Sequence, residues 1–448
     1  MAIDLRDQHH AQIEKLAAEL VPNNQPLRVK KKTISNLFRY EGRDKKGRKS
    51  INLSKFNKAL FLDTKKQTLE VQGLATFESI VDFTLPHGLL PLITPELKHI
   101  TIGGATVGIG IEANTHKYGF VHNSLIEADV LLADGRIVTC SATNDYADLF
   151  NGLANSYGTL GYILRAKIKL RSTKPYMQVT TKKFTDITKY LEALKTAGAN
   201  ATIEMVEGLV YGPKEFYLTT GRETNKIQNL KTIYKNAIFY KDISKAGTFT
   251  LPTKEYLFRY DPEWFWNMPE TKTFNVMRRL LPTKLRNSGF YSRYSRLNLA
   301  IPFLKDEAKD DAFEHLIQDW EVPWKYAKHL LTFIFKSVDL NKKPMAIVLV
   351  KVPKTATSYP LIPNKLYINV GSYSFVKRNP GQEKFDATRA IDDFTFKHEG
   401  LKMLYSSTFV SKNRFDQVYN GNEYAKLKAK YDPKNLVPTL FEKAVQSR

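Results

Sequence analysis

The chain has 448 residues, a formal net charge of +23 and a pI near 9.6. Hydrophobic residues make up 42% of it, enough to bury a sizeable core, so a globally disordered protein is excluded. The length predicts about two domains, and the lack of any run of about 18 consecutive apolar residues argues against a transmembrane helix.

Residues 1–21 predict a polar amphipathic helix, without the basic start and cleavage site of a secretory signal. Cys140 is the single cysteine, which fits a reducing compartment, so we expect a cytoplasmic protein. The positive charge attracts polyanions. It indicates either solvated lysines that maintain solubility or peripheral contact with an anionic membrane surface. No zinc-ligand spacing or other nucleic-acid module supports binding to nucleic acid, and no metal site is expected.

Residues 27–172 alternate short β-rich runs with turn signals, which predicts an α+β domain. The β-rich runs are TLEVQG (68–73), HITIGGATVGIG (99–110), ADVLLADGRIVTC (128–140) and LGYILRAKIKLRS (160–172). The segment 76–88 between two of them is helix-like. Asp134-Gly135 predicts a hairpin with a type I′ turn, in which both central residues have positive φ. The basic, proline-containing segment 171–177 predicts a domain boundary.

The region after this boundary has a different sequence pattern, which predicts a separate α+β domain. Strands are expected at MVEGLVYG (205–212), EFYLTTGRE (215–223), LTFIFKSV (331–338), MAIVLVKV (345–352) and KLYINVGSYSFV (365–376), and helices at 387–400 and from 422 onward. Residues 256–297 interleave aromatic and basic side chains. This belt fits an interfacial surface on anionic lipid, or a domain core with a solvated basic rim.

Three loops carry residues suited to binding phosphate. Glycine lets the backbone approach a ligand and present N–H groups to phosphate oxygens. The loops contribute Thr33, Ser35 and Asn36; Gly103, Gly104, Gly108 and Gly110; and Gly158, Thr159 and Gly161. A Rossmann fingerprint is disfavoured because the second loop continues into the polar, irregular IEANTHKYG.

The chain resembles the FAD-binding domain of the vanillyl-alcohol-oxidase superfamily, with its PCMH-type fold, and within it the Δ24-sterol reductase branch. The resemblance rests on the pattern P-E-L…T-I-G-G…G-I-G-I-E…T-H-K-Y-G between Pro95 and Gly119, on ADVLLADGRIV, and on Asp148-Leu149-Phe150. It continues at Gly158–Gly161, around Trp320, and from Met403 to Tyr431. It implies a PCMH-type FAD-binding domain at 1–172, an inserted α+β substrate (cap) domain at 173–414, and a segment at 415–448 that returns to the first domain.

The resemblance also assigns cofactor-binding residues. The first two loops would contact the FAD pyrophosphate and ribityl chain, and the third loop would lie near the adenosine half. Thr115, His116 and Gly119 would lie near the isoalloxazine ring, and Val107, Ile111 and Asn114 are also assigned as cofactor-binding. Many members of the superfamily tether FAD through a histidine in the first loop. KKTISNLFR has none, so we expect non-covalent FAD.

Candidates for proton transfer are His116 and the tyrosines Tyr405, Tyr419 and Tyr424, because a hydroxyl or an imidazole can supply a proton opposite a hydride. The function expected first is reduction of a C=C bond in a sterol- or isoprenoid-like apolar substrate, with NAD(P)H as electron donor. The alternatives are an FAD-linked oxidase or dehydrogenase of an alcohol or sugar, and a non-enzymatic basic protein that binds membrane or nucleic acid.

Overall fold

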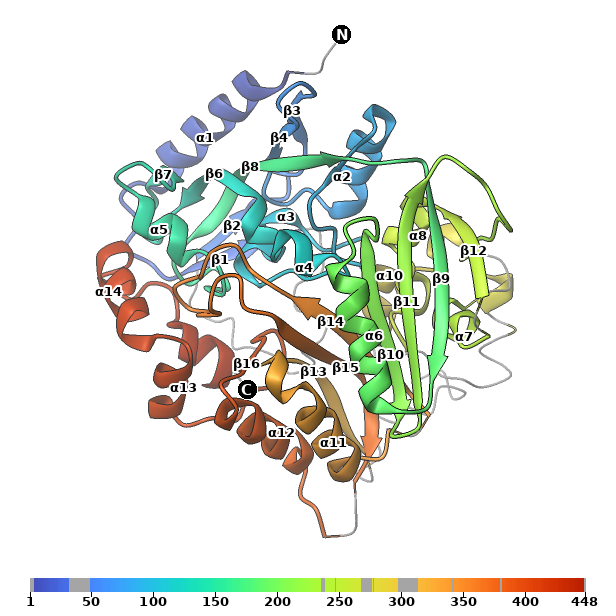
Figure 1. Cartoon of the computed structure of the whole chain (residues 1–448). Helices are drawn as coiled ribbons and strands as arrows, with labels where there is room; N and C mark the ends of the chain where they lie inside the picture. The colour runs from blue at the N-terminus through green and yellow to red at the C-terminus, as the bar shows by residue number, and fades with distance from the viewer. Residues whose placement is uncertain are drawn as a thin grey trace.

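Two antiparallel sheets organise the chain, and the computed structural model describes most of both (Figure 1). The described residues are 4–31, 49–234, 238–245, 247–266, 276, 278–296, 313–340, 342–378 and 381–446. The combination of helices with two separate sheets confirms the α+β class. Among the described residues, no helix is both long enough and apolar enough to cross a bilayer.

The first sheet is formed by the N-terminal part of the chain, in the order β3-β4-β8-β6-β7, with β5 also paired to β8. Its strands, and those of a separate parallel ribbon β1–β2, are β1 (Leu27–Lys30), β2 (Lys49–Asn52), β3 (Ala59–Asp63), β4 (Thr68–Gln72), β5 (Leu89–Pro91), β6 (Leu125–Leu131), β7 (Ile137–Ser141) and β8 (Tyr162–Ser172). The helices around it are α1 (Arg6–Leu20), α2 (Phe77–Thr84), α3 (Ile102–Val107), α4 (Thr115–Tyr118) and α5 (Ala147–Gly152). The helix expected at 76–88 is therefore confirmed as α2.

Two local predictions for this sheet need correction. The hairpin between β6 and β7 exists, but of the two turn residues only Gly135 has positive φ (92°), so the turn is not type I′. The run HITIGGATVGIG forms the helix α3 instead of a strand. The Thr101 side chain caps this helix by accepting a hydrogen bond from the Gly104 N–H at 3.2 Å, which favours the helical over the extended backbone.

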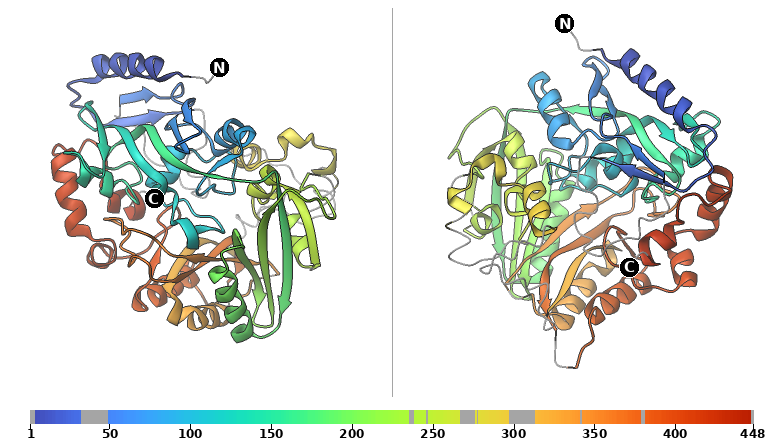
Figure 2. Two further views of the ribbon diagram at one scale, coloured as in Figure 1. Left: turned by 45° about the horizontal axis from the view of Figure 1, so that its top comes forward. Right: turned by 180° about the vertical axis from the view of Figure 1, so that it is seen from behind.

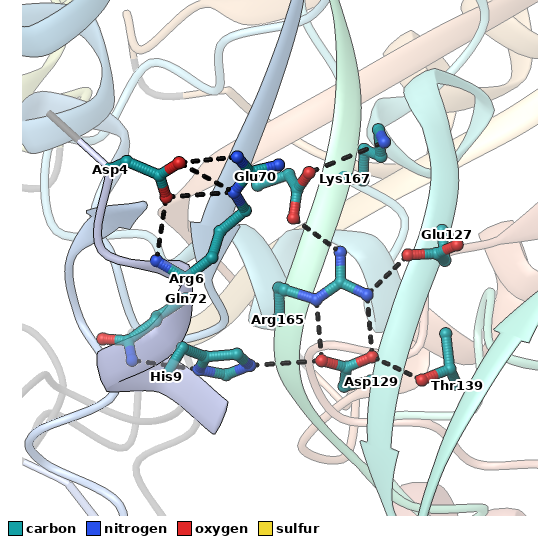
Figure 3. Close-up of polar contacts among 10 residues, drawn as sticks. All are labelled: Asp4, Arg6, His9, Glu70, Gln72, Glu127, Asp129, Thr139, Arg165 and Lys167. Atoms are coloured by element: carbon teal, nitrogen blue, oxygen red, sulfur yellow. Dashed lines mark hydrogen bonds and ion pairs between the residues drawn. The ribbon is translucent and has the colours of Figure 1, made fainter. Parts of the chain in front are cut away.

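A buried polar network fastens α1 to the sheet, as Figure 3 shows. The Arg165 guanidinium on β8 donates to both carboxylate oxygens of Asp129 at 2.7 and 2.8 Å and to Glu70 at 3.1 Å. From α1, the His9 Nε2 lies 3.1 Å from the same Asp129 carboxylate. Burial raises the pKa of Asp129, but the hydrogen bonds from His9 and Arg165 outweigh this effect and hold it well below its usual range.

The second sheet has eight strands in the order β12-β9-β11-β10-β14-β15-β13-β16, all antiparallel. Its strands are β9 (Tyr176–Phe184), β10 (Met205–Gly212), β11 (Glu215–Thr224), β12 (Gly247–Pro252), β13 (Phe313–Pro323), β14 (Met345–Val350), β15 (Tyr367–Lys377) and β16 (Leu401–Lys402). The helices of this part include α6 (Ile187–Ala199), α7 (Phe239–Ile243), α8 (Thr253–Leu257), α10 (Ser288–Arg296), α11 (Ala327–Ser337) and α12 (Asp386–Lys397). The strand expected at LTFIFKSV is wrong: this run lies in α11, whose apolar side chains pack in the core beneath the sheet.

The two faces of the second sheet have different environments because successive side chains of a strand point to opposite sides. Residues such as Val206, Trp320 and Val370 lie in a core shared with α6, α11 and α12. The residues next to them in sequence, including Glu207 and Asp319, point to the other face. That face packs against segments of the first sheet's domain, and it brings buried acidic side chains to the junction between the sheets.

The C-terminal helices return to the first half of the chain, and the views of Figure 2 show them beside it. They are α13 (Lys412–Val418), α14 (Gly421–Tyr431) and a final turn, η7 (Glu442–Gln446). The Tyr431 hydroxyl at the end of α14 donates to Asp148 of α5 at 2.6 Å. Residues separated by more than 280 positions are thereby in direct contact.

Candidate functional site

The glycine-rich segment that follows Thr101 is held in a conformation that side chains would obstruct. A Cβ atom on Gly103 would lie 2.8 Å from the Gly73 carbonyl oxygen, and one on Gly110 would lie 2.6 Å from a methyl group of Val121. Contacts this short require the backbone or the core to shift. These glycines therefore let α3 pack directly against the neighbouring chain.

Part of this segment also remains accessible to solvent. Gly104 is exposed, and half-buried positions follow at Val107, Gly108, Gly110 and Ile111. Backbone that lacks side chains and reaches the surface can present its N–H groups to an anion. The arrangement fits the phosphate-binding role expected for this loop.

The loop at 156–161 lies against the glycine-rich segment. The Tyr157 N–H donates to the Val107 carbonyl at 3.0 Å, and the Tyr157 hydroxyl donates to the Gly108 carbonyl at 3.3 Å. Gly158 and Gly161 both have positive φ, 76° and 147°, which favours glycine at these turns. The fold thus brings together two of the three predicted phosphate loops. The other predicted phosphate loop, with Thr33, Ser35 and Asn36, lies outside the described residues.

The C-terminal helices hold the 156–161 loop from the opposite side. The buried Tyr424 hydroxyl donates to the Thr159 hydroxyl oxygen at 2.8 Å and accepts a hydrogen bond from the Leu440 N–H at 2.9 Å. The Lys428 ammonium donates to the Thr159 carbonyl at 3.2 Å and is paired with Asp432. Both polar functions of the Tyr424 hydroxyl are therefore engaged in holding this loop, which favours a positioning role over proton transfer.

The Thr115–Tyr118 element forms the single turn α4, followed by Gly119 with φ of 74°. Thr115 accepts a hydrogen bond from the Glu112 N–H at 3.1 Å, and Asn114 donates to the Leu92 carbonyl at 3.0 Å. These contacts fix the chain that leaves the glycine-rich loop.

The His116 ring is buried, with neither nitrogen hydrogen-bonded to a described residue, and it packs near Gly198 of α6. Burial lowers the pKa of His116 to about 4, so the ring is neutral at neutral pH. The neutral ring keeps one N–H donor and one acceptor nitrogen, so His116 can form hydrogen bonds with a ligand but is not a cationic acid.

Tyr405 faces the buried Asp319 on β13. Its hydroxyl donates to Asp319 Oδ2 at 2.8 Å, the Tyr373 hydroxyl donates to the same oxygen at 2.9 Å, and Asn369 donates to Oδ1 at 2.7 Å. Burial, and after it the charge of Asp319, raise the pKa of Tyr405 well above its usual value. Tyr419 is buried and donates to the Lys402 carbonyl at 2.9 Å. The phenol of Tyr405 is thus oriented but not acidified.

The aromatic cluster at Tyr256–Trp266 lies in the core, which agrees with the second of the two interpretations of residues 256–297, a domain core. Its six aromatic side chains, Tyr256, Phe258, Tyr260, Trp264, Phe265 and Trp266, are all buried. Phe265 stacks on Tyr373 of β15 with ring centroids 4.0 Å apart. The cluster therefore packs against the sheet face that carries Asp319.

Sequence analysis missed the acidic side chains of this junction: Glu96, Glu112, Glu207, Asp319 and Glu321. The available signal was a carboxylate inside an apolar strand run, as in MVEGLVYG and LIQDWEVP, which requires a buried partner. The partner of the first three is Arg259, a single basic residue within the aromatic cluster.

Comparison with known proteins matches the N-terminal part of the chain to a described domain. A family model described as an FAD binding domain matches residues 5–141, which include the glycine-rich segment and α4. The chain carries an FAD binding domain of the PCMH type. It is an FAD-dependent oxidoreductase.

The relatives of this enzyme include reductases that align with nearly the whole chain. It is 26% identical to the Delta(24)-sterol reductase of Homo sapiens over 430 residues, which cover 90% of this chain and 78% of that protein. The Delta(24)-sterol reductase of Arabidopsis thaliana is 24% identical over 448 residues, covering 89% and 77%. Cytokinin dehydrogenase 3 of Oryza sativa subsp. japonica is 30% identical over 144 residues, covering only 32% and 27%.

The residues of the junction fit the cofactor. The accessible glycine backbone at Gly104, Gly108 and Gly110 suits a pyrophosphate, and the buried, unpartnered oxygen of Asn114 lies in the segment that follows it. The residues that would hold FAD are those of the glycine-rich segment and the 156–161 loop. When bound, the flavin supplies hydride chemistry, while the protein positions the substrate and excludes water.

Proposed function

We propose that the enzyme reduces a C=C bond in a sterol- or isoprenoid-like apolar substrate, with NAD(P)H as the electron donor. The observation that carries this proposal is the extent of the likeness to Delta(24)-sterol reductases, which covers 90% of the chain and so includes the second sheet. The likeness to a cytokinin dehydrogenase covers only 32% of the chain. The part outside the FAD binding domain is thus shared with the reductases.

The character of the junction supports an apolar substrate. A sugar pocket needs many convergent polar groups, because each buried hydroxyl left unpaired costs about 1–3 kcal/mol. At the junction Glu96, Glu112 and Glu207 are paired with Arg259, and the sheet face near Asp319 also carries aromatic side chains, including Phe265, Trp266 and Tyr373. Burying an apolar tail against such walls contributes about 25 cal/mol per Å².

We also propose that FAD is held without a covalent bond. The first phosphate loop has no histidine. The single cysteine, Cys140, is buried in β7, and burial raises the pKa of its thiol to about 12, so little of the reactive thiolate forms. Acid or heat precipitation should therefore release yellow flavin into the supernatant. Flavin that stays with the precipitated polypeptide would contradict the proposal.

Anaerobic half-reactions test the substrate class. NADPH or NADH should bleach the flavin absorbance, and an isoprenoid alkene should restore it. An alcohol or a sugar should leave the oxidised flavin unchanged. Rapid bleaching by an alditol or aldonolactone, with no response to a reduced nicotinamide, would replace the reductase with the alternative, an oxidase or dehydrogenase.

We further propose that this cytoplasmic protein contacts anionic membranes through a basic surface that includes exposed apolar side chains. Leu280 is 80% exposed and Val276 is 56% exposed, and Arg279 and Lys284 are exposed close to them in sequence. The protein should sediment with anionic vesicles and be released by salt, because exposed charges are screened within about 10 Å at 0.1 M. Equal recovery with neutral vesicles would refute this contact.

A further inference from the structure

Arg259 holds three carboxylates on one nitrogen. Its Nη2 lies 2.8 Å from Glu96 Oε1, 2.9 Å from Glu112 Oε1 and 2.7 Å from Glu207 Oε2. The Arg259 side chain is fully buried, and those of Glu112 and Glu207 are nearly so, whereas 17% of the Glu96 side chain is exposed. The three acids come from different segments: the loop before α3, the end of the glycine-rich segment, and β10.

Arg259 Nη2 has too few hydrogens to give each of three ionised carboxylates a hydrogen bond of its own. A guanidinium Nη atom carries two hydrogens, so it can give one each to two of the three neighbouring oxygens. At least one of these hydrogens is therefore shared between two carboxylate oxygens, as in a three-centre hydrogen bond. Three ionised acids around one cation would also leave two uncompensated negative charges in a buried site, and buried like charges of this kind cannot all persist.

The contacts indicate which of the acids carries the additional proton. Glu207 accepts hydrogen bonds from Arg259 Nε, at 3.0 Å, and from Arg259 Nη2. The Tyr260 hydroxyl donates to it at 3.2 Å, so three hydrogen bonds stabilise its carboxylate. Glu112 accepts from the Ala113 N–H at 2.6 Å through Oε1, but its buried Oε2 has no hydrogen-bond partner. The proton therefore belongs to the Glu96–Glu112 pair.

We propose that Glu96 and Glu112 share one proton at neutral pH, and that this pair is the proton-donor site for the reduction of the alkene. The delivery step rests on the proposed function. The carboxyl O–H bond breaks and a C–H bond forms at one alkene carbon, while the other carbon receives hydride, with its electron pair, from the nicotinamide-reduced flavin. The carboxylate left behind is stabilised by Arg259 and regains a proton from water through the partly exposed Glu96.

The surroundings of the pair are consistent with a retained proton. The titratable or charged groups that face it are Arg259, Glu207, Tyr256, Tyr260, Asp319 and Tyr373. Burial, and after it the neighbouring Glu112, raise the pKa of Glu96 well above its usual value, against the opposing effect of Arg259. The charge of Asp319 also raises the pKa of Glu96, and Asp319 accepts the hydrogen bonds from Tyr373 and Tyr405.

The first test measures the proton without cofactor or substrate. A carboxyl that stays protonated in the folded state loses its proton on unfolding, so the unfolding equilibrium constant rises with pH between the unfolded pKa, about 4.3, and the raised folded pKa. Each retained proton contributes about a tenfold rise per pH unit. The slope of the logarithm of this equilibrium constant against pH counts the protons lost on unfolding. In apoprotein, Glu96→Gln and Glu112→Gln should each reduce this slope by up to one proton relative to the wild type.

The matched control is Glu223→Gln, because Glu223 is a partly buried acid that pairs with Arg171 outside the Arg259 cluster. It should leave the slope between about pH 6 and 8 unchanged. All other titratable groups are the same in every variant, so comparison with the wild type removes their contribution to the slope. An unchanged slope in Glu96→Gln, Glu112→Gln and the double variant would overturn the shared proton.

The second test separates the two half-reactions. In Glu96→Gln or Glu112→Gln, reduction of the bound flavin by NADPH should stay within a few-fold of the wild type, whereas reoxidation by an isoprenoid alkene should slow by about 10²–10⁴-fold. Reoxidation at the wild-type rate in both variants would overturn the donor role. If no alkene reoxidises the wild-type flavin, the proposed function fails, and the shared proton measured on the apoprotein stands by itself.

Discussion

Replacing Tyr424 with phenylalanine tests whether the C-terminal helices position the cofactor loop. The change removes a buried hydroxyl that donates to Thr159 at 2.8 Å and accepts from the Leu440 N–H at 2.9 Å. Leaving that buried N–H unpaired costs about 1–3 kcal/mol, and the lost hydrogen bond to Thr159 adds about 0.5–1.5 kcal/mol. We expect the free energy of unfolding to fall by about 2–4 kcal/mol.

The same change should loosen the 156–161 loop and weaken FAD binding by about tenfold, or about 1.4 kcal/mol. Denaturant unfolding of the apoprotein measures the first effect, and titration of flavin fluorescence measures the second. Tyr146→Phe, at the start of the adjacent α5, is the matched control and should change neither quantity by much. An unchanged unfolding free energy with normal FAD binding, together with slow alkene reoxidation, would refute the positioning role and restore Tyr424 as a proton donor.

Three further predictions concern other parts of the structure. Asp129→Asn leaves the buried Arg165 without its main counter-charge and should cost about 3–5 kcal/mol of unfolding free energy at pH 7. The folded pKa of Asp129 is lowered, so its contribution to the free energy of unfolding is complete above the unfolded pKa of about 3.9. This contribution is lost as the pH falls through the folded pKa, and the unfolding curves of the two proteins should therefore converge in acid. Gly103→Ala should shift α3 at a cost of about 1–3 kcal/mol and reduce the flavin content of purified protein, and full retention of flavin would contradict the packing argument. Tyr405→Phe should leave FAD bound and change the rate of alkene reoxidation by only a few-fold, because the pKa of Tyr405 is raised. Reoxidation slowed by more than about 10²-fold would identify its hydroxyl as a proton donor beside the Glu96–Glu112 pair.

Local patterns predicted much of the first domain because they report short-range physics. The helix at Phe77–Thr84 begins at a capping threonine and buries one apolar face, and both signals are visible in the sequence. Asp134-Gly135 likewise marked the hairpin between β6 and β7. The wrong secondary-structure predictions concern apolar, β-branched runs, whose pattern fits both a helix and a strand. LTFIFKSV became α11 because its apolar side chains fill the core beneath the second sheet, and tertiary packing of this kind overrides local propensity.

For the candidate site, the expectation of FAD came from the resemblance of the sequence to a family of FAD-binding domains. The glycine pattern between Gly103 and Gly110 depends on backbone that must approach its neighbours closely, so residue identity there is a local requirement. The contact of that segment with the 156–161 loop joins residues 49 positions apart, so the fold brings them together.

Only the tertiary structure decided the charge arrangement. Glu96, Glu112, Glu207 and Arg259 are separated by up to 163 residues and meet because strand alternation on β10 turns one acid toward the junction while the glycine-rich segment ends beside it. The same packing buried the aromatic cluster that composition had suggested for a membrane surface. Electrostatic energies depend on distance and burial, and neither quantity is encoded in sequence separation, so the protonation of this cluster became visible only in the folded chain.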